Sequence, residues 1–386
     1  MKLVEQTISF IHDWYQTNGT ISLHEPRFNS IEKDLLLDCI DSTYVSSVGK
    51  YVDQFEKMTE DFTGAKKSVV TVNGTAAIHV SLKVLGVEPG CEVLTQTLSF
   101  IATANAISYT GAEPVFLDVD LDTLGLSPAA VKNYLNEYAE LRDDGFTYNK
   151  VNQKRIAACV PMHTFGHPAR IEEIVKICGE YNIPVLEDAA ESLGSTRNNI
   201  HTGLFGVAGA LSYNGNKIIT TGGGGSIITN DIDLGKRLKH MTTTAKIPHT
   251  WEFIHDEIGY NYRMPNINAA LGCAQMAKLE LYLKDKRDLA EHYKEFFSGS
   301  SVQFVDEPEN CRSNFWLNAI ILESKEHKDI FLKEMNDKKV MVRPIWKLLS
   351  TLPMYQHCFS RDLINSKWLE ERVVNLPSSV RIMDKI

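Results

Sequence analysis

Apolar and polar positions alternate between two rhythms from residue 69 to about residue 240. Short apolar runs such as Val115–Leu117 and Ile156–Val160 are typical of strands. They alternate with segments of helical period, for example Ile171–Cys178. This order predicts an α/β fold with a wound, mixed and mostly parallel sheet.

The remainder of the chain predicts a second, smaller α/β domain. Residues 245–256 read as the passage between domains, because Pro248 interrupts any continuous helix there. A helical pattern through Ile267–Gln275 follows and would open the smaller domain. The predicted division is therefore residues 1–247, an N-terminal helix with the large domain, and residues 248–386, the small one. Residues 140–155 are polar and read as a surface loop.

Composition limits the class of protein. Forty Lys and Arg against forty-nine Asp and Glu leave a net charge of −9 over 386 residues, so no basic surface for nucleic acid or anionic membranes is expected. No apolar run reaches the length of a membrane span, and residues 1–14 have helical spacing instead of the continuous apolar core of a signal peptide. Seven scattered cysteines form no CxxC pair. Reduced thiols in a cytoplasmic protein are the simplest expectation.

A metal site is not expected from the histidine pattern. His163 and His167 have the (i, i+4) spacing, but Gly166 and Pro168 favour a loop there over a helix. His163 follows a predicted strand, where it either lines a substrate pocket or caps the strand end.

The segment Ala210–Lys217, followed by the turn Thr220–Gly225, provides candidate chemistry. A lysine that holds a carbonyl cofactor needs a fixed backbone, a partly desolvated amine and space above it, which strand residues followed by glycines supply. The alternative is an ordinary solvated lysine beside a hairpin turn.

An apolar strand over Ile183–Leu186 leads into Glu187 and Asp188, about thirty residues before that lysine. Pyridoxal phosphate (PLP) withdraws electrons only while its pyridine nitrogen is protonated, and a paired aspartate keeps it protonated. Successive strand residues face opposite sides, so only one of the two acids faces the cofactor, and Asp188 is the better candidate. The alternative is a surface acid in a turn.

A third segment, Val69–Ile78, reads as a strand, a tight turn at Gly74 and Thr75, and a helix. Free amides at a helix N-terminus bind phosphate, and Gly74 permits close approach of the backbone. The chain has neither GxGxxG nor GxxxxGKS, which argues against dinucleotide or Walker-type binding.

These three segments, in this order, resemble the DegT/DnrJ sugar-nucleotide aminotransferases, a family of fold-type I PLP enzymes. The resemblance covers nearly the whole chain and is carried by Thr97–Asn105, Glu187–Ala190, Ser212–Lys217 and His255–Pro265. Two further segments, Leu23–Pro26 and Asp41–Lys50, resemble the branch that makes 4-amino sugars for bacillosamine or legionaminic acid.

The resemblance implies a role for each matching position. Lys217 would form the Schiff base with PLP and shuttle the proton between the substrate α-carbon and C4′ of the cofactor. Asp188 would pair with the pyridine nitrogen, and Phe100 would stack on the ring unless it only packs in the core. Glu191 lies where relatives carry Gln or His near the phenolic oxygen of the cofactor. A carboxylate there has to be protonated or paired.

The same resemblance implies the remaining contacts and the assembly. Gly74, Thr75 and Ser212 would hold the phosphate, and Asn261 would reach it from a neighbouring subunit. A homodimer with shared active sites follows from that role. The alternative for Asn261 is a loop amide with local hydrogen bonds.

The expected reaction moves an amino group from L-glutamate to C4 of a nucleotide-linked 4-keto-6-deoxy sugar for bacterial surface glycans such as O-antigen. The sugar is expected to be UDP-2-acetamido-2,6-dideoxy-hexos-4-ulose, although UDP, GDP and dTDP stay open. One alternative is a PLP-dependent sugar dehydratase, which Lys217 disfavours because relatives specialised for 3-deoxygenation tend to carry histidine there. Another is a regulatory or binding protein on the same fold.

Overall fold

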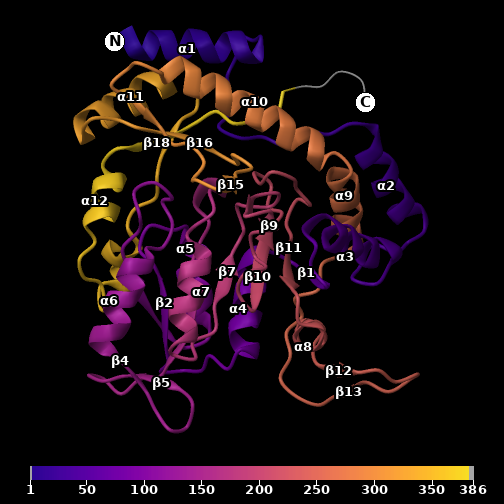
Figure 1. Cartoon of the computed structure of the whole chain (residues 1–386). Helices are drawn as coiled ribbons and strands as arrows, with labels where there is room; N and C mark the ends of the chain where they lie inside the picture. The colour runs from indigo at the N-terminus through magenta and orange to yellow at the C-terminus, as the bar shows by residue number, and fades with distance from the viewer. Residues whose placement is uncertain (1, 382–386) are drawn as a thin grey trace.

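The central feature of the computed structural model, which describes residues 2–381, is one mixed sheet (Figure 1). Isolated bridges between β6 and β7 join its two portions. All its strands run parallel except β11, which is antiparallel to both neighbours. The order is β3 (Glu113–Leu117), β2 (Glu92–Gln96), β6 (Ile156–Val160), β7 (Leu186–Asp188), β10 (Ala208–Ser212), β11 (Gly225–Thr229) and β1 (Lys67–Thr71). The predicted wound, mostly parallel sheet is confirmed.

Helices cover both faces of this sheet. One face packs on α4 (Gly74–Val84), α5 (Ile101–Tyr109) and α8 (Ile232–Thr242). The other face packs on α6 (Pro128–Tyr138), α7 (Ile171–Gly179), α3 (Lys50–Thr63) and α9 (Asn266–Met276). Neighbouring strand residues serve opposite faces, as Val69 and Val70 do. This two-sided burial explains why the strands read as continuous apolar runs.

A second sheet lies above the first in Figure 1 and is antiparallel throughout. Its order is β14 (Gln303–Phe304), β16 (Asn318–Ile321), β18 (Val373–Leu376) and β17 (Arg343–Pro344). Four further helices are α1 (Lys2–Tyr15), α10 (Leu279–Phe297), α11 (Lys325–Asp337) and α12 (Ile364–Glu370). Of these, α1, α10 and α11 share an apolar cluster with β16 and β18.

The packing does not follow the predicted division after residue 247. Helix α1 buries Val4 and Ile11 in the cluster of the C-terminal sheet, and Ile21 bridges Val340 in the same region. Conversely, α9 was expected to open the small domain but packs against α3 and α2 (Ser30–Asp41) beside the large sheet. Helical period shows which face of a helix is apolar, not which partner covers it.

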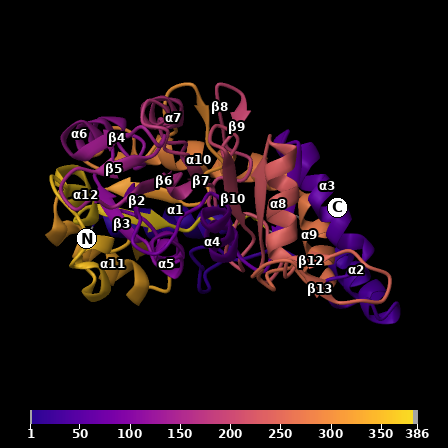
Figure 2. The ribbon, with the colours of Figure 1, turned by 90° about the horizontal axis from the view of Figure 1, so that it is seen from below.

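Two predicted connections carry strands of their own. Residues 140–155 contain the hairpin of β4 (Ala139–Leu141) and β5 (Thr147–Asn149). Residues 245–256, which were expected to be the passage between domains, contain a second hairpin, in which β12 (Lys246–Ile247) pairs with β13 (Ile254–His255). Their hairpin extends away from the rest of the chain at the lower right of Figure 1, and Figure 2 views it from below.

The remaining elements are short strands and single turns of helix. A three-stranded sheet contains β15 (Cys311–Arg312), β8 (Thr196–Arg197) and β9 (Ile200–His201). Single turns of 3₁₀ helix span Thr164–Gly166, Leu349–Thr351 and Pro353–Tyr355. Within residues 2–381, every helix is too short or too polar to cross a membrane.

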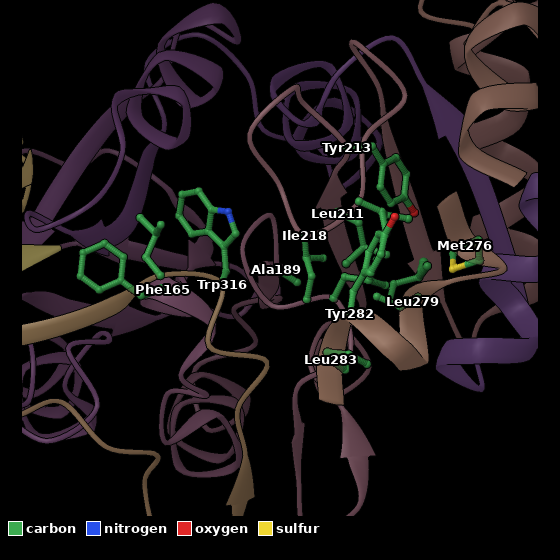
Figure 3. Close-up of a cluster of buried hydrophobic side chains, with 14 of the residues drawn as sticks. Phe165, Ala189, Leu211, Tyr213, Ile218, Met276, Leu279, Tyr282, Leu283 and Trp316 are labelled. Carbon is green, nitrogen blue, oxygen red and sulfur yellow. The ribbon is translucent and has the colours of Figure 1, made fainter. Parts of the chain in front are cut away.

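The largest apolar cluster lies where α3, α9 and α10 meet the end of β10. Figure 3 shows part of it, with Leu211, Tyr213 and Ile218 beside Tyr282 and Leu283, and with Trp316 and Phe165 farther to the left. Phe55 of α3 is fully buried there, and its ring centroid is 4.9 Å from that of Tyr213. A Cβ at Gly272 of α9 would come within 2.8 Å of the same ring, so a glycine allows this close approach.

Replacing Phe55 with alanine removes the ring that joins α3, α9 and β10. We expect Phe55→Ala to lower the free energy of unfolding by about 3–5 kcal/mol, the range for a buried aromatic side chain. Urea unfolding would measure the loss. Val151→Ala, at an exposed loop position, is the control and should be neutral. A loss below about 1 kcal/mol for Phe55→Ala would contradict this description of the core.

Candidate active site

The start of α4 provides an anion site at the end of β1. The side-chain oxygen of Asn73 accepts a hydrogen bond from Ala76 N–H at 2.7 Å and caps the helix. The first amides of an α-helix have no partner within the helix, so Gly74 and Thr75 offer theirs to the cavity that they line. A Cβ at Gly74 would lie 3.0 Å from Cβ of Ser212, which also lines the cavity. The strand, turn and helix predicted here are all present.

Asp188 lies at the carboxyl end of β7 and is buried. Its Oδ2 accepts a hydrogen bond from the Thr103 hydroxyl at 2.6 Å, and its Oδ1 accepts one from Ala190 N–H at 3.2 Å. Burial raises the pKa of this carboxyl. A cation beside it, such as a protonated pyridine nitrogen, would favour the ionised form.

Glu187 faces the opposite side of the sheet, as the strand alternation predicts. It accepts hydrogen bonds from backbone N–H groups, including that of Gly203 at 2.7 Å, and contacts His163 Nε2 at 2.9 Å. His163 is fully buried, and its Nδ1 accepts from Ala169 N–H at 3.1 Å. Among residues 2–381, the residues that line the cavity do not include His163. Its contacts therefore match the alternative of a residue that holds the strand end, and they do not support the predicted contact with substrate.

Lys217 lies in the loop that joins β10 to β11. Backbone hydrogen bonds from Tyr213 to Gly224 and from Lys217 to Asn214 fix the loop at 2.8 and 2.9 Å. The lysine side chain is only 12% exposed. Its Nζ lies 3.9 Å from the centroid of the Trp316 ring, and the indole N–H of Trp316 donates to Asn216 O at 2.7 Å. Lys217 is thus a partly desolvated amine on a fixed backbone, and not a solvated surface lysine.

Glu191 contacts that amine. Its Oε1 is 3.2 Å from Lys217 Nζ, and its Oε2 accepts from Phe165 N–H at 2.9 Å. Burial raises the pKa of Glu191 to about 7, against the lowering effect of Lys217. The carboxyl group is therefore both paired and partly protonated near neutral pH, which are the two conditions predicted for an acid at this position.

Phe100 completes one wall of the cavity. It lies just before α5, and 49% of its surface is exposed although it is a large apolar residue. Its ring centroid is 6.4 Å from that of Trp346, so one aromatic wall includes both rings. An aromatic face left open to a cavity is suited to stacking against a planar ligand, which core packing alone does not explain.

The cavity that these residues share has a volume of about 840 Å³. The donor set fits PLP: N–H groups for the phosphate, a buried carboxyl for the ring nitrogen, an open aromatic face and a lysine. Asn261 lies apart from it, because it is exposed, bridges Thr243, and is not among the described residues that line the cavity. Its predicted role depends on a second subunit.

Sequence reasoning missed several residues that line the same cavity. Trp316 and Trp346 lack any motif, and the basic residues Lys328, Arg343 and Lys347 come from separate parts of the C-terminal region. The one local signal is the pair of basic residues that flank Pro344–Trp346.

One group outside the cavity has the geometry of metal ligands. Ligand atoms of His240, Asp256 and Glu257 lie within 4.8 Å of one another near the β12–β13 hairpin. Arg237 already pairs with Glu257, with NH2 to Oε2 at 2.5 Å, so a cation is present there.

Comparison with known proteins agrees with this site. Residues 27–385 match the DegT/DnrJ/EryC1/StrS aminotransferase family. The chain is 34% identical to a GDP-perosamine synthase of Escherichia coli O157:H7 over 358 residues, 93% of each chain. It is also 34% identical over 336 residues to a putative pyridoxal phosphate-dependent aminotransferase, EpsN, of Bacillus subtilis, covering 87% of this chain and 84% of the relative.

Solved structures show the same fold. A DegT/DnrJ/EryC1/StrS aminotransferase from Brucella abortus superimposes with a TM-score of 0.81 at 26% identity, covering 92% of each chain. Helicobacter pylori PseC, an aminotransferase, superimposes with a TM-score of 0.84 at 23% identity, covering 93% of each chain. The family match over nearly the whole chain and the lysine-centred cavity lead to one conclusion: this chain belongs to the DegT/DnrJ/EryC1/StrS family and is a PLP-dependent sugar aminotransferase.

Proposed function

We propose that the protein transfers the amino group of L-glutamate to the C4 keto group of a nucleotide-linked 4-keto-6-deoxy sugar. The observation that carries the proposal is the amine of Lys217 in a cavity that also contains Asp188, Glu191 and the phosphate site of α4. The proposed acceptor is UDP-2-acetamido-2,6-dideoxy-hexos-4-ulose. Its support is the resemblance of Leu23–Pro26 and Asp41–Lys50 to the bacillosamine and legionaminic acid branch.

A GDP-linked ketosugar is the second candidate. Relatives from Escherichia coli, Vibrio cholerae and Caulobacter vibrioides, at 31–34% identity, are named GDP-perosamine synthases. Each match covers 93% of this chain. The two candidates differ in the nucleotide and in the substituent at C2, so one substrate comparison separates them.

Each of these cavity residues has a separate role in the proposed reaction. PLP, when bound, supplies the electron sink through which amino and keto groups exchange. Asp188 holds the proton at the pyridine nitrogen, and Gly74, Thr75 and Ser212 bind the phosphate. Nζ of Lys217 removes a proton from the substrate carbon that bears nitrogen and later returns one. Glu191 accepts a hydrogen bond from that amine and orients it.

The substrate is tested by following both half-reactions in absorbance. We expect L-glutamate to remove the visible band of the lysine-bound cofactor and the UDP-linked ketosugar to restore it. Restoration by the GDP-linked sugar alone would select the second candidate. A sugar product without the new nitrogen would select the dehydratase.

Lys217→Ala should lower turnover by at least about 1,000-fold, within the range of one general acid or base. Normal turnover would refute its role.

Glu191 gives a test that depends on pH. With a pKa of about 7 in the folded protein, and about 4.3 for an unperturbed glutamate, the folded state binds this proton more tightly. The stability it contributes is full below about pH 4 and is lost as pH rises through 7. Relative to wild type, cofactor-free Glu191→Gln should therefore gain about 1–3 kcal/mol between pH 5 and pH 8.

Urea unfolding at the two pH values measures this difference. Glu137→Gln, at an exposed position, is the control and should keep a constant offset from wild type. A constant offset for Glu191→Gln as well would show that the buried carboxyl is ionised throughout.

A homodimer with shared active sites is also part of the proposal. The β12–β13 hairpin and the residues around it expose Trp251 and Phe253, at 76% and 82%, and also Ile258. Exposed apolar side chains on a hairpin that projects from the chain (Figure 1) are unusual for a free surface and typical of an interface. Asn261 follows the hairpin, from where it would reach the phosphate site of the other subunit.

Replacing both aromatic residues tests this assembly. We expect Trp251→Asp with Phe253→Asp to convert a dimer into monomers in sedimentation velocity and to lower PLP retention, because charged residues would be buried without partners. Val151→Asp, at an exposed loop position outside this hairpin, should stay dimeric. A wild-type monomer with full activity would refute the shared site.

The proposed setting is the cytoplasm. All seven cysteines are free and six are buried, which supports a reducing environment.

A further inference from the structure

Three basic residues form one wall of the active-site cavity, which we call the basic wall: Lys328 of α11, Arg343 of β17, and Lys347 just after β17. None of them is used by the mechanism described above. All three come from the C-terminal region, whereas the candidate cofactor residues come from the large sheet and its loops.

Among the described residues, Lys347 is the member of this wall that is paired with a carboxylate, and Lys328 and Arg343 are not. Asp329 pairs with Lys325 at 2.8 Å, and Glu370 pairs with Lys347 at 3.3 Å. Lys328 Nζ donates to the backbone oxygen of Glu370 at 2.7 Å. Among residues 2–381, no carboxylate lies within ion-pair distance of Lys328.

Arg343 is in the same situation. Its NH1 donates to Asn336 Oδ1 and to Val342 O, both at 2.9 Å. Within the described part of the chain it also has no carboxylate partner. The planar guanidinium therefore keeps donors for a bidentate contact with an anion.

Lys328 differs from the other two because it is buried, with only 6% of its surface exposed. Burial lowers the pKa of its ammonium group. A charged amine that faces a cavity without a counter-ion is costly, and a bound anion would offset that cost. The wall thus contains a deep cation and two cations nearer the solvent.

The basic wall adjoins the aromatic wall of the cavity. Trp346 lies between Arg343 and Lys347 in the chain, and its ring centroid is 6.4 Å from Phe100 and 5.1 Å from Phe165. In a nucleotide-linked sugar, the breadth of the ring separates the C4 keto group from the diphosphate. A site for that substrate therefore needs cations in the same cavity as the reactive lysine but on a different wall.

We propose that Lys328, Arg343 and Lys347 bind the diphosphate of the nucleotide-linked sugar. The inference rests on the proposed function, because it takes a sugar nucleotide as the acceptor. Arg343 contacts phosphate oxygens with its guanidinium fork, Lys328 supplies a fixed charge in the depth of the cavity, and Lys347 supplies charge at its mouth. The base and ribose make no contribution to this contact, so UDP and GDP are held alike.

The test uses the holoenzyme and the double variant Arg343→Ala with Lys347→Ala, since both side chains are exposed and their loss spares the core. Calorimetry with UDP, GDP and uridine gives dissociation constants. We expect the variant to bind UDP and GDP about 10- to 100-fold more weakly, as the loss of charge-assisted hydrogen bonds predicts. KM for the ketosugar should rise by a similar factor, while the rate of the glutamate half-reaction stays within about twofold. Uridine, which lacks phosphate, should bind wild type and variant alike.

Two further variants sharpen the result. Lys328→Met keeps the aliphatic stem and should weaken UDP and GDP in the same way. Lys333→Ala is the matched control on α11, since Lys333 is exposed, pairs with Asp337 and does not line the cavity. It should bind both nucleotides as wild type does.

Each other outcome has a defined meaning. Unchanged affinity for UDP and GDP in the variants, with normal turnover by wild type, would overturn the basic wall and leave the proposed function intact. A rise in KM for glutamate instead of the sugar would assign the wall to the carboxylates of the donor and also overturn it. If GDP-linked sugar is the substrate and the variants still lose affinity, the UDP assignment fails and the diphosphate site stands.

Discussion

The parallel pairing of β7 with β10 is the constraint on which the active site depends. It opposes Asp188 to Ala210, so the carboxyl ends of both strands meet at one edge of the sheet. The chain then leaves β10 for the loop that carries Lys217, while β7 delivers its acid to the same cavity. Ligand sites of open α/β sheets form at this edge because the loops there leave a crevice.

Buried polar groups keep that pairing in place. Glu187, beside Asp188, accepts hydrogen bonds from the N–H groups of Gly203, Phe205 and Gly206 at 2.7 Å. A buried carboxylate with several donors is stable, and this one ties the end of β7 to the connection that leads into β10. The hydrogen bonds of Glu187, which faces away from the cavity, thus fix the strand end that carries Asp188. On the other side of the lysine loop, the contact between Trp316 and Asn216 has the same effect.

The parts of the site that sequence predicted share one property, which is a local signal. Gly74, Asp188 and Lys217 each lie at or within a few residues of a strand end. Strand ends, glycine turns and helix starts can be recognised from residues that are adjacent in the sequence. The fold class followed from the same alternation. His163 also follows a predicted strand, which left a pocket residue and a strand cap as alternatives; it is not among the described residues that line the cavity, and its ring contacts Glu187, which faces the opposite side of the sheet.

The parts that sequence did not predict depend on distant pairing. Lys328 and Arg343 line the cavity only because α11 and β17, which pack in the C-terminal region, border the same cavity as the loops of the large sheet, and no spacing in the chain encodes that. Trp316 meets Lys217 across about a hundred residues. The period of α1 showed an apolar stripe but not its partner, which begins more than 250 residues later in the chain.

The contact of α1 with the C-terminal elements limits when α1 can pack during synthesis of the chain. Helix α1 is made early, but its apolar face is completed by α10, α11, β16 and β18, which begin more than 250 residues later in the chain. The large sheet can assemble while translation proceeds, since all its strands lie between Lys67 and Thr229. Helix α1 therefore keeps its apolar stripe uncovered until α10, α11, β16 and β18 have been made. Its docking joins segments that lie far apart in the chain, and it comes after the large sheet has been made.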